Sequence, residues 1–338
     1  MKNNLLVKLL VFAVIVAWTV TSGTAWAADI NKHKFKFAFQ NTKEHPQGQG
    51  AVKFAELVKE KSNGKMTVQL FPSGMLGGDL QTVSALQGGT IDFTVLNAGL
   101  LVGLVPAFGI FDFPFMFNNE AEADAIVDGD FGKMMFAKLP EKGLVGLGYW
   151  ELGFRNMTNN VRPITKLEDF SGIKLRVLQS PVFIDTFNEL GCNTVPLPYP
   201  ELYTALEQHV VDGQENPVTN VQFASFYEVQ KYFSFTKHIY SPQSTLISKR
   251  TWDKLTADEK QIIVDAEKEA KLYQRQVNRS QMAKSLEFIK TKMAVNEISP
   301  AEMKRIREAA KPVYEKNTPK VGQDVVDAFN AAIAKVRN

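Results

Sequence analysis

Cysteine is almost absent from this sequence of 338 residues, in which Cys192 stands alone. A single cysteine excludes an internal disulfide. Cys192 follows Gly191 in a run of apolar residues and prolines. We expect it to be a small buried hydrophobe rather than a nucleophile, because reactive thiols need an electropositive and partly exposed setting.

An excess of charge of one sign is also absent. The chain has 39 basic and 36 acidic residues, and the first 27 residues hold two of the bases, Lys2 and Lys8, and no acid. The remainder is therefore balanced to within one charge, and no block of like charge interrupts it. This balance gives no electrostatic basis for binding nucleic acid or anionic lipid.

The motifs of common catalytic and metal sites are missing as well. The four histidines, His33, His45, His209 and His238, have neither H-x-x-x-H nor H-E-x-x-H spacing, so we expect no zinc site. No G-x-S-x-G elbow, phosphate loop or dinucleotide fingerprint is present. Acid pairs such as Glu207 and Asp212 are too common to indicate a glycosidase. We therefore predict a protein that is not an enzyme and needs no cofactor, with a secreted hydrolase as the alternative.

One apolar run is present, at the N-terminus. Leu9 to Val20 is too short to span a bilayer, and the small-x-small triplet Ala25-Trp26-Ala27 follows it. We predict a cleaved signal peptide over residues 1–27 and a periplasmic mature protein, with a membrane anchor as the alternative. No later segment has about 18 uninterrupted apolar residues, so we expect no membrane span in the mature chain.

The first half of the mature chain alternates between strand and helix patterns. Strands are predicted over 34–39, 66–70 and 90–96, and helices between Ala51 and the C-cap pair Asn63-Gly64 and over 79–86. This order favours a parallel sheet with helices on its faces.

The pattern restarts after the Gly-, Phe- and Pro-rich section 106–117. Short strands are predicted over 146–150 and 154–158, on either side of Gly153, and another over 173–177. Ser180-Pro181 then predicts a helix with Ser180 as its N-cap, ending at Gly191. We therefore predict an α/β protein of two domains, with the break near Gly153.

The segment from Gln243 to Ser299 contains neither glycine nor proline. Apolar residues recur in it at intervals of three or four. Spacing alone allows one long helix that reaches across two domains, or two helices separated by a kink.

Polar residues at predicted strand ends are the candidates for binding. Arg176 ends the strand 173–177 on the face opposite its apolar residues, and Arg155 follows Gly153-Phe154. A guanidinium there can hold a carboxylate with two hydrogen bonds. Asn216 precedes Pro217, where a helix can begin, and its amide can both donate and accept. An N-cap loop at Asn216 and surface ion pairs at the arginines are the structural alternatives.

The sequence resembles the substrate-binding subunits of tripartite ATP-independent periplasmic (TRAP) transporters, the DctP-type family. The resemblance covers nearly the whole mature chain. Four stretches carry it: Phe71-Pro72-Ser73-Gly74 with Leu76-Gly77-Gly78-Asp79; Gly153 to Asn159; Ile173 to Val177 with Ser180-Pro181; and Glu201 to Leu206 with Val211 to Pro217.

The resemblance implies two domains that close on a ligand, joined by crossing strands and a long shared helix. Domain I would comprise residues 28–153 and about 240–280, and domain II residues 154–239 and about 281–338. Arg176 would bind the ligand carboxylate in a bidentate way, assisted by Arg155 and Asn216, with Tyr199 over the ligand. Asp79 and the segment Leu96-Asn97-Ala98-Gly99 would line the cleft, and Gln40 and Trp150 are weaker candidates.

The chain departs from the sialic acid-binding members of the family. They typically carry an acid and an arginine where this chain has Asn97 and Leu100. We therefore expect a smaller or differently decorated organic anion, and a hydroxylated carboxylate or sugar acid is our hypothesis, with a sulfonate as the alternative. The resemblance implies delivery to the membrane subunits of the transporter, and we expect a monomer. A binding protein of another transporter class, or a receptor ectodomain, would have a similar fold.

Overall fold

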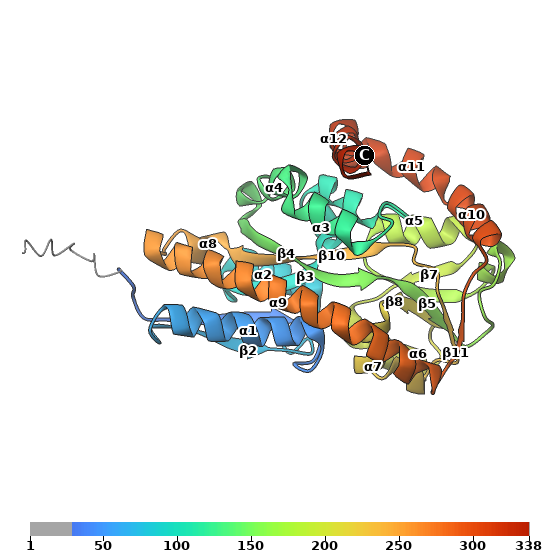
Figure 1. The fold of residues 1–338 in the computed structure, drawn as a ribbon, viewed down its shortest axis with the longest axis horizontal. Helices are drawn as coiled ribbons and strands as arrows, with labels where there is room; N and C mark the ends of the chain where they lie inside the picture. Colours follow the sequence, from blue (N-terminus) through green and yellow to red (C-terminus); the bar gives the residue numbers. More distant parts are fainter. Residues whose placement is uncertain (1–28, 338) are drawn as a thin grey trace, which may run out of the picture.

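A computed structural model describes residues 29–337, which form two β-sheets surrounded by helices (Figure 1). The predicted signal peptide, residues 1–27, lies outside the described residues. The first sheet has the strand order β2-β1-β3-β10-β4 and the second has the order β11-β9-β5-β8-β6-β7. The prediction of a two-domain α/β architecture is confirmed.

The first sheet consists of β2 (Met66–Phe71), β1 (His33–Phe39), β3 (Phe93–Asn97), β10 (Tyr240–Ser248) and β4 (Leu144–Phe154). β1, β2 and β3 run parallel, as predicted, whereas β10 is antiparallel to both β3 and β4. The first sheet is therefore mixed, with one antiparallel strand, β10, between β3 and β4. The alternating aromatics of β1, Phe35, Phe37 and Phe39, are buried together, as their spacing predicts.

The second sheet consists of β11 (Ala294–Asn296), β9 (Tyr232–Ser234), β5 (Asn156–Asn159), β8 (Gly213–Asn216), β6 (Lys174–Val177) and β7 (Asn193–Pro196). β6 is parallel to β7 and β8, whereas β5 is antiparallel to β8 and β9. β6 and β8 therefore end at the same edge of the sheet.

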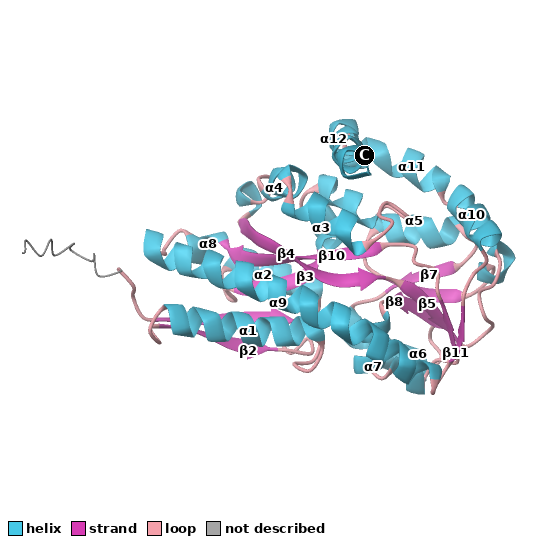
Figure 2. Cartoon of the chain, in the orientation of Figure 1, coloured by secondary structure: helices cyan, strands magenta, loops and turns pink. Residues whose placement is uncertain are grey.

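The helices lie around the two sheets (Figure 2). Their bounds are α1 (Pro46–Lys61), α2 (Asp79–Gly88), α3 (Glu120–Asp128), α4 (Asp130–Phe136), α5 (Pro181–Glu189), α6 (Leu202–Glu207), α7 (Val218–Phe223), α8 (Lys249–Trp252), α9 (Ala257–Lys290), α10 (Pro300–Ala309), α11 (Lys311–Val321) and α12 (Gln323–Arg337). The 3₁₀ turns η1 (Ala98–Gly103), η2 (Pro106–Asp112) and η5 (Tyr199–Glu201) are part of the connections. Among residues 29–337, no helix combines the length and apolarity needed to cross a lipid bilayer.

α9 is one continuous helix of 34 residues and runs along both sheets (Figure 1). It begins with a capping box between Thr256 and Glu259. It packs against α1 and β4 beside the first sheet and against α7 and β11 beside the second. Of the two arrangements that the spacing allowed, the single long helix is therefore the observed one.

Two further connections join the sheets. β4 leads through Arg155 into β5, and residues 235–239 return from β9 to β10. β4 runs through Gly153 as one strand, so the predicted short strand 146–150 is in fact the middle of a longer one. Gly153 lies where the chain leaves the first sheet. Its φ of 108° is a backbone conformation that residues other than glycine rarely adopt.

Two predictions for single residues have different outcomes. Cys192 is buried, its Sγ lies 3.3 Å from the carbonyl oxygen of Phe170, and burial raises the pKa of its thiol to about 12, so the structural assignment is confirmed. Ser180 does stand at the N-cap position of α5, but its side chain makes no capping hydrogen bond. Its hydroxyl donates instead to the carboxyl group of Asp112, 2.6 Å away.

Candidate functional site

A small pocket lined mostly by polar side chains lies where strands of the two sheets end. Its lining consists of Gln40, Asn41, Gln47, Asp79, Leu96, Asn97, Leu152, Leu178, Tyr199, Asn216, Asn220 and Gln243. Strand ends at the edge of an α/β sheet are the usual place for ligand sites. Five residues predicted from the sequence, Gln40, Asp79, Asn97, Tyr199 and Asn216, are thus brought together here.

Arg176 lies behind this lining, at the end of β6, and is 1% exposed. Its Nε and Nη2 atoms donate to the carbonyl oxygen of Leu197, at 3.0 and 2.5 Å, which fixes one edge of the guanidinium. Nη1 is buried and has no partner among the described residues. A guanidinium carries five N–H groups in a rigid fork, so the Nη1–Nη2 edge remains able to hold a carboxylate.

The charge of Arg176 is only partly compensated by the protein. Burial lowers its pKa to about 10, and the charges of Glu215, Tyr199 and Asp79 oppose this effect. Asp79 retains partial solvent exposure, yet the loss of water around its carboxyl group raises its pKa to about 7, against the influence of Arg176. The site therefore has a buried cation with an unused donor atom, which favours an anionic ligand.

Three amide side chains of the lining have an oxygen atom that accepts no hydrogen bond from the described residues. Oε1 of Gln40, Oδ1 of Asn97 and Oε1 of Gln243 are all buried without a hydrogen-bond partner among the described residues. Nε2 of Gln40 donates to the carbonyl oxygen of Gly77, which orients that amide. An unsatisfied buried acceptor costs about 1–3 kcal/mol, so these oxygens suit a ligand that brings hydroxyl donors.

Arg155 is not available in the same way, because Glu215 holds it. Its Nε and Nη2 atoms donate to the two carboxylate oxygens of Glu215, at 2.5 and 2.9 Å. Nη2 also donates to Oδ1 of Asn216 at 3.1 Å. Burial alone would raise the pKa of Glu215, but the charge of Arg155 and hydrogen bonds from His238 and Arg155 hold that pKa below its ordinary value. Arg155 thus orients Asn216 through this buried ion pair.

Trp150 lies outside the pocket lining. It packs in the core beside Phe37, and its indole Nε1 donates to the carboxyl group of Glu267 on α9 at 3.2 Å. The next lining residue along β4 is Leu152, two positions later.

Asn41, Gln47, Asn220 and Gln243 are pocket residues that the sequence analysis missed. Gln243 stands in the middle of β10, whose nine residues are all buried, and it pairs with Asn97 on β3. A polar side chain inside a fully buried strand is a useful signal, but β10 could be recognised as a buried strand only from the structure. Asn220 lies in the first turn of α7, four positions after Asn216 at the end of β8, and both residues line the pocket.

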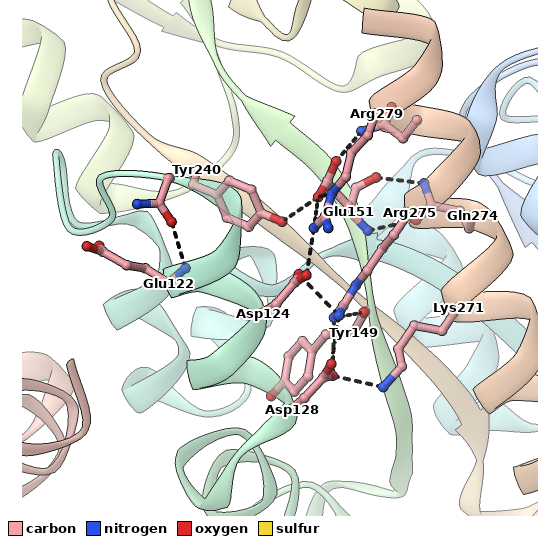
Figure 3. A network of polar contacts seen from close by, with 12 residues as sticks. Glu122, Asp124, Asp128, Tyr149, Glu151, Tyr240, Lys271, Gln274, Arg275 and Arg279 are labelled. Atoms are coloured by element: carbon pink, nitrogen blue, oxygen red, sulfur yellow. Dashed lines mark hydrogen bonds and ion pairs between the residues drawn. The ribbon is translucent and has the colours of Figure 1, made fainter. Parts of the chain in front are cut away.

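A charged network next to the pocket ties α9 to β4 (Figure 3). Glu151 is fully buried on β4, and its carboxylate accepts from Arg279 of α9 at 2.6 Å and from the hydroxyl of Tyr240 at 3.1 Å. Gln274 exchanges two hydrogen bonds with the backbone of Glu151. Arg279 also donates to Asp124 of α3 at 2.7 Å. The long helix is therefore fixed to the strand that carries Leu152 and Gly153.

Comparisons with known proteins identify relatives of this chain. The model of the family described as bacterial extracellular solute-binding protein, family 7 (DctP) matches residues 37–320. The 2,3-diketo-L-gulonate-binding periplasmic protein YiaO of Escherichia coli is 34% identical over 299 residues, which are 87% of this chain and 90% of that protein.

Two solved structures are similar to the whole described chain. The sugar acid binding protein DctPAm of Advenella mimigardefordensis, in complex with galactonate, is 41% identical, with a TM-score of 0.90 over 91% of this chain and 99% of that one. A TRAP periplasmic solute binding protein of Ochrobactrum anthropi is 54% identical, with a TM-score of 0.82 over 91% of this chain and 97% of that one. This protein therefore belongs to the DctP family of bacterial extracellular solute-binding proteins, whose members serve TRAP transporters and are not enzymes.

Proposed function

We propose that this protein captures a hydroxylated carboxylate of the open-chain sugar acid class and delivers it to the membrane subunits of a TRAP transporter. One observation carries the proposal. Arg176 on the second sheet has an unused buried donor. On the side of the first sheet, Gln40 directly after β1, Asn97 on β3 and Gln243 on β10 have unused buried acceptors. A molecule with a carboxylate at one end and hydroxyl groups along its length would satisfy both sets.

The roles of the individual residues follow from this arrangement. Arg176 holds the carboxylate through its free edge, and Tyr199 covers the ligand. Asn216, oriented by Arg155, contributes its amide at the same end. Gln40, Asn97 and Gln243 accept from ligand hydroxyls, and Asp79 does so at the entrance.

Binding would work by closure of two lobes and involve no chemistry. We assign residues 28–153 and about 240–280 to one lobe, and 154–239 and about 281–338 to the other. α12 also packs against α3 and α4 of the first lobe. The proposed lobes come close together beside Gln40, where a Cβ on Gly74 would stand 2.6 Å from Pro200 and 3.1 Å from Oε1 of Gln40. We expect ligand entry to require separation of the lobes, and closure then to strengthen charge-assisted bonds by excluding water.

The similarity to proteins described as binding galactonate and 2,3-diketo-L-gulonate supports the ligand class, since both are sugar acids. We further propose that residues 1–27 are a cleaved signal peptide, that the mature protein acts in the periplasm as a monomer, and that its partners are the membrane subunits of the transporter.

A thermal-shift screen followed by calorimetry tests this function. We expect D-galactonate to raise the melting temperature and to bind at least tenfold more tightly than succinate, which has carboxylates but no hydroxyls. Isethionate, a small hydroxylated sulfonate, tests the alternative headgroup. Tighter binding of succinate or isethionate than of any sugar acid would contradict the proposed ligand class.

A further inference from the structure

His45 has a defined protonation state in this structure. It is buried at the N-cap of α1, and its Nδ1 atom accepts from the backbone N–H of Gln47 at 3.0 Å. Because Nδ1 accepts, the ring proton of the neutral imidazole resides on Nε2. Nε2 lies 3.3 Å from Oδ1 of Asn220 and donates to it. The ring also packs edge-on against Phe223.

This donor sets the orientation of Asn220, which lines the pocket. With Oδ1 facing His45, the Nδ2 atom of Asn220 donates to Oδ1 of Asn41 at 3.0 Å and to the hydroxyl of Tyr199 at 3.4 Å. Asn220 and Tyr199 belong to the side of the second sheet, whereas His45 and Asn41 belong to the side of the first. These hydrogen bonds therefore join the two lobes at the pocket wall.

We infer that His45 is a positioning residue for ligand capture: its neutral ring holds Asn220 across the cleft, so closure on the ligand requires His45 to be unprotonated. This inference rests on the proposed function, because it takes closure on a ligand as given. Protonation would place an N–H on Nδ1 against the N–H of Gln47 and add positive charge at the N-terminus of α1, where the helix dipole disfavours it.

Among residues 29–337, no charged group contributes to the pKa shift of His45. α7 carries no charged residue, and the one titratable group reached from η5 is Tyr199, through Asn220. Lys43 and Glu44 in the loop before α1 are exposed to solvent. Burial accordingly lowers the pKa of His45 to about 3, and the hydrogen bond with Asn220 opposes this shift.

The two lobe arrangements therefore differ in their affinity for a proton. When the lobes separate, His45 loses Asn220 and Phe223 and its pKa rises toward its ordinary value of about 6.5. Because closure lowers the pKa of His45, the closed form binds a proton more weakly than the open form. Below the open-form pKa, protonation of His45 therefore shifts the equilibrium toward the open form. Ligand affinity should thus weaken as the pH falls below about 6.5, by about tenfold between pH 7.5 and pH 5.5.

Other groups in this region have shifted pKa values, among them His238, Asp79 and Asp112, whose carboxyl group accepts from Ser180 of the other lobe. His238 is also buried, and its ring contacts Thr236, Glu215 and Phe187 on the side of the second sheet, while its carbonyl oxygen accepts from the backbone N–H of Phe115. The raised pKa of Asp79 lies in the same pH range. Its effect on affinity is opposite to that of His45, because a protonated carboxyl group no longer repels an anionic ligand. The Asp79→Asn background removes this contribution. The comparison with His45→Asn in the same background then isolates the contribution of His45, because Asp112 is present in both proteins.

Calorimetry with D-galactonate at pH 7.5 and pH 5.5 tests the inference, in the Asp79→Asn background and in the otherwise unchanged protein. His45→Asn retains an N-cap acceptor for α1 but neither titrates nor reaches Asn220. We expect this variant to bind about fivefold more weakly at pH 7.5 and to change less than twofold between the two pH values. His209→Asn, at an exposed histidine, should keep the pH dependence. If His45→Asn retains the full pH dependence, the inference is wrong.

A second measurement follows His45 itself, in the free protein and then with galactonate. Nitrogen NMR of the histidine rings in the free protein should show His45 as the Nε2–H tautomer, with a pKa that falls on addition of galactonate. An Nδ1–H tautomer, or a pKa that galactonate does not lower, would overturn the inference. A wrong proposed function would give a different result. Galactonate would then not bind at pH 7.5, whatever the protonation state of His45.

Discussion

The carboxylate of Glu215 holds the guanidinium of Arg155 at 2.5 and 2.9 Å, and both side chains are fully buried. Because of this ion pair, Arg155 and Arg176 have different roles. Arg155 is neutralised by the protein, whereas Arg176 keeps an unused Nη1 atom beside the pocket. Arg176 is therefore the residue that a ligand carboxylate would meet, and Arg155 supports the wall through Asn216.

Removing the Arg176 guanidinium should abolish most of the affinity. We expect Arg176→Ala to weaken binding of the cognate acid more than tenfold, because loss of one partner of a buried ion pair costs about 3–5 kcal/mol. Arg176→Lys should also weaken binding, because an ammonium cannot present two parallel N–H groups. Calorimetry measures both, with Arg250→Ala as an exposed control. Equal affinity of the lysine variant would mean that the contact is not bidentate.

Neutralising Glu215 should destabilise the fold more than it affects ligand contacts. Glu215→Gln leaves Arg155 charged and fully buried, so we expect a loss of about 3–5 kcal/mol in the free energy of unfolding. Urea unfolding measures this, and Glu201→Gln, at an exposed glutamate, is the matched control. A loss no greater than that of the control would show that the pair does not stabilise the protein.

The backbone conformation at Gly153 should make any side chain there destabilising. A Cβ there would meet nothing closer than 3.7 Å, so Gly153→Ala tests the φ of 108° alone. We expect a cost of about 1–2 kcal/mol. Gly88→Ala at the end of α2, where nothing lies within 4 Å of a Cβ, should be neutral or slightly stabilising. Equal stabilities of the two variants by urea unfolding would contradict the strain at Gly153.

Asp112 should make stability depend on pH. Burial raises its pKa to about 7, and the hydrogen bond from Ser180 opposes this shift. A carboxyl group with a raised folded-state pKa contributes stability below its unfolded pKa, near 4, and this contribution is lost as the pH rises toward 7. Asp112→Asn, which keeps an acceptor for Ser180, should therefore gain stability relative to the unchanged protein by a few kcal/mol between pH 4.5 and pH 8. A difference that is constant with pH in urea unfolding would rule out this role for Asp112.

The sequence allowed more of the fold than of the pocket to be predicted. Alternating aromatics in β1 and the turn at Asn63-Gly64 are local signals, and both elements lie where they were expected. The direction of β10 is set by its pairing with β3 and β4, so a single segment could not reveal it. Ser180 shows the limit of local rules, because a carboxyl group distant in sequence, Asp112, takes the hydroxyl expected to cap α5.

The residues of the candidate site that could be predicted are those implied by the resemblance to the TRAP substrate-binding family. Gln40, Asp79, Asn97, Tyr199 and Asn216 line one pocket, and Arg176 lies behind it. Trp150 could not be separated from them by residue type, because an indole suits a pocket wall and a core equally well. The contact between His45 and Asn220 joins residues 175 positions apart and required the three-dimensional arrangement.

A crystal structure of the complex with D-galactonate tests the central claim most directly. The account predicts the carboxylate on the Nη1–Nη2 edge of Arg176 and at least one hydroxyl donating to Oε1 of Gln243 or Gln40. A complex in which Nη1 of Arg176 stays without a ligand contact, with the carboxylate bound elsewhere, would contradict it.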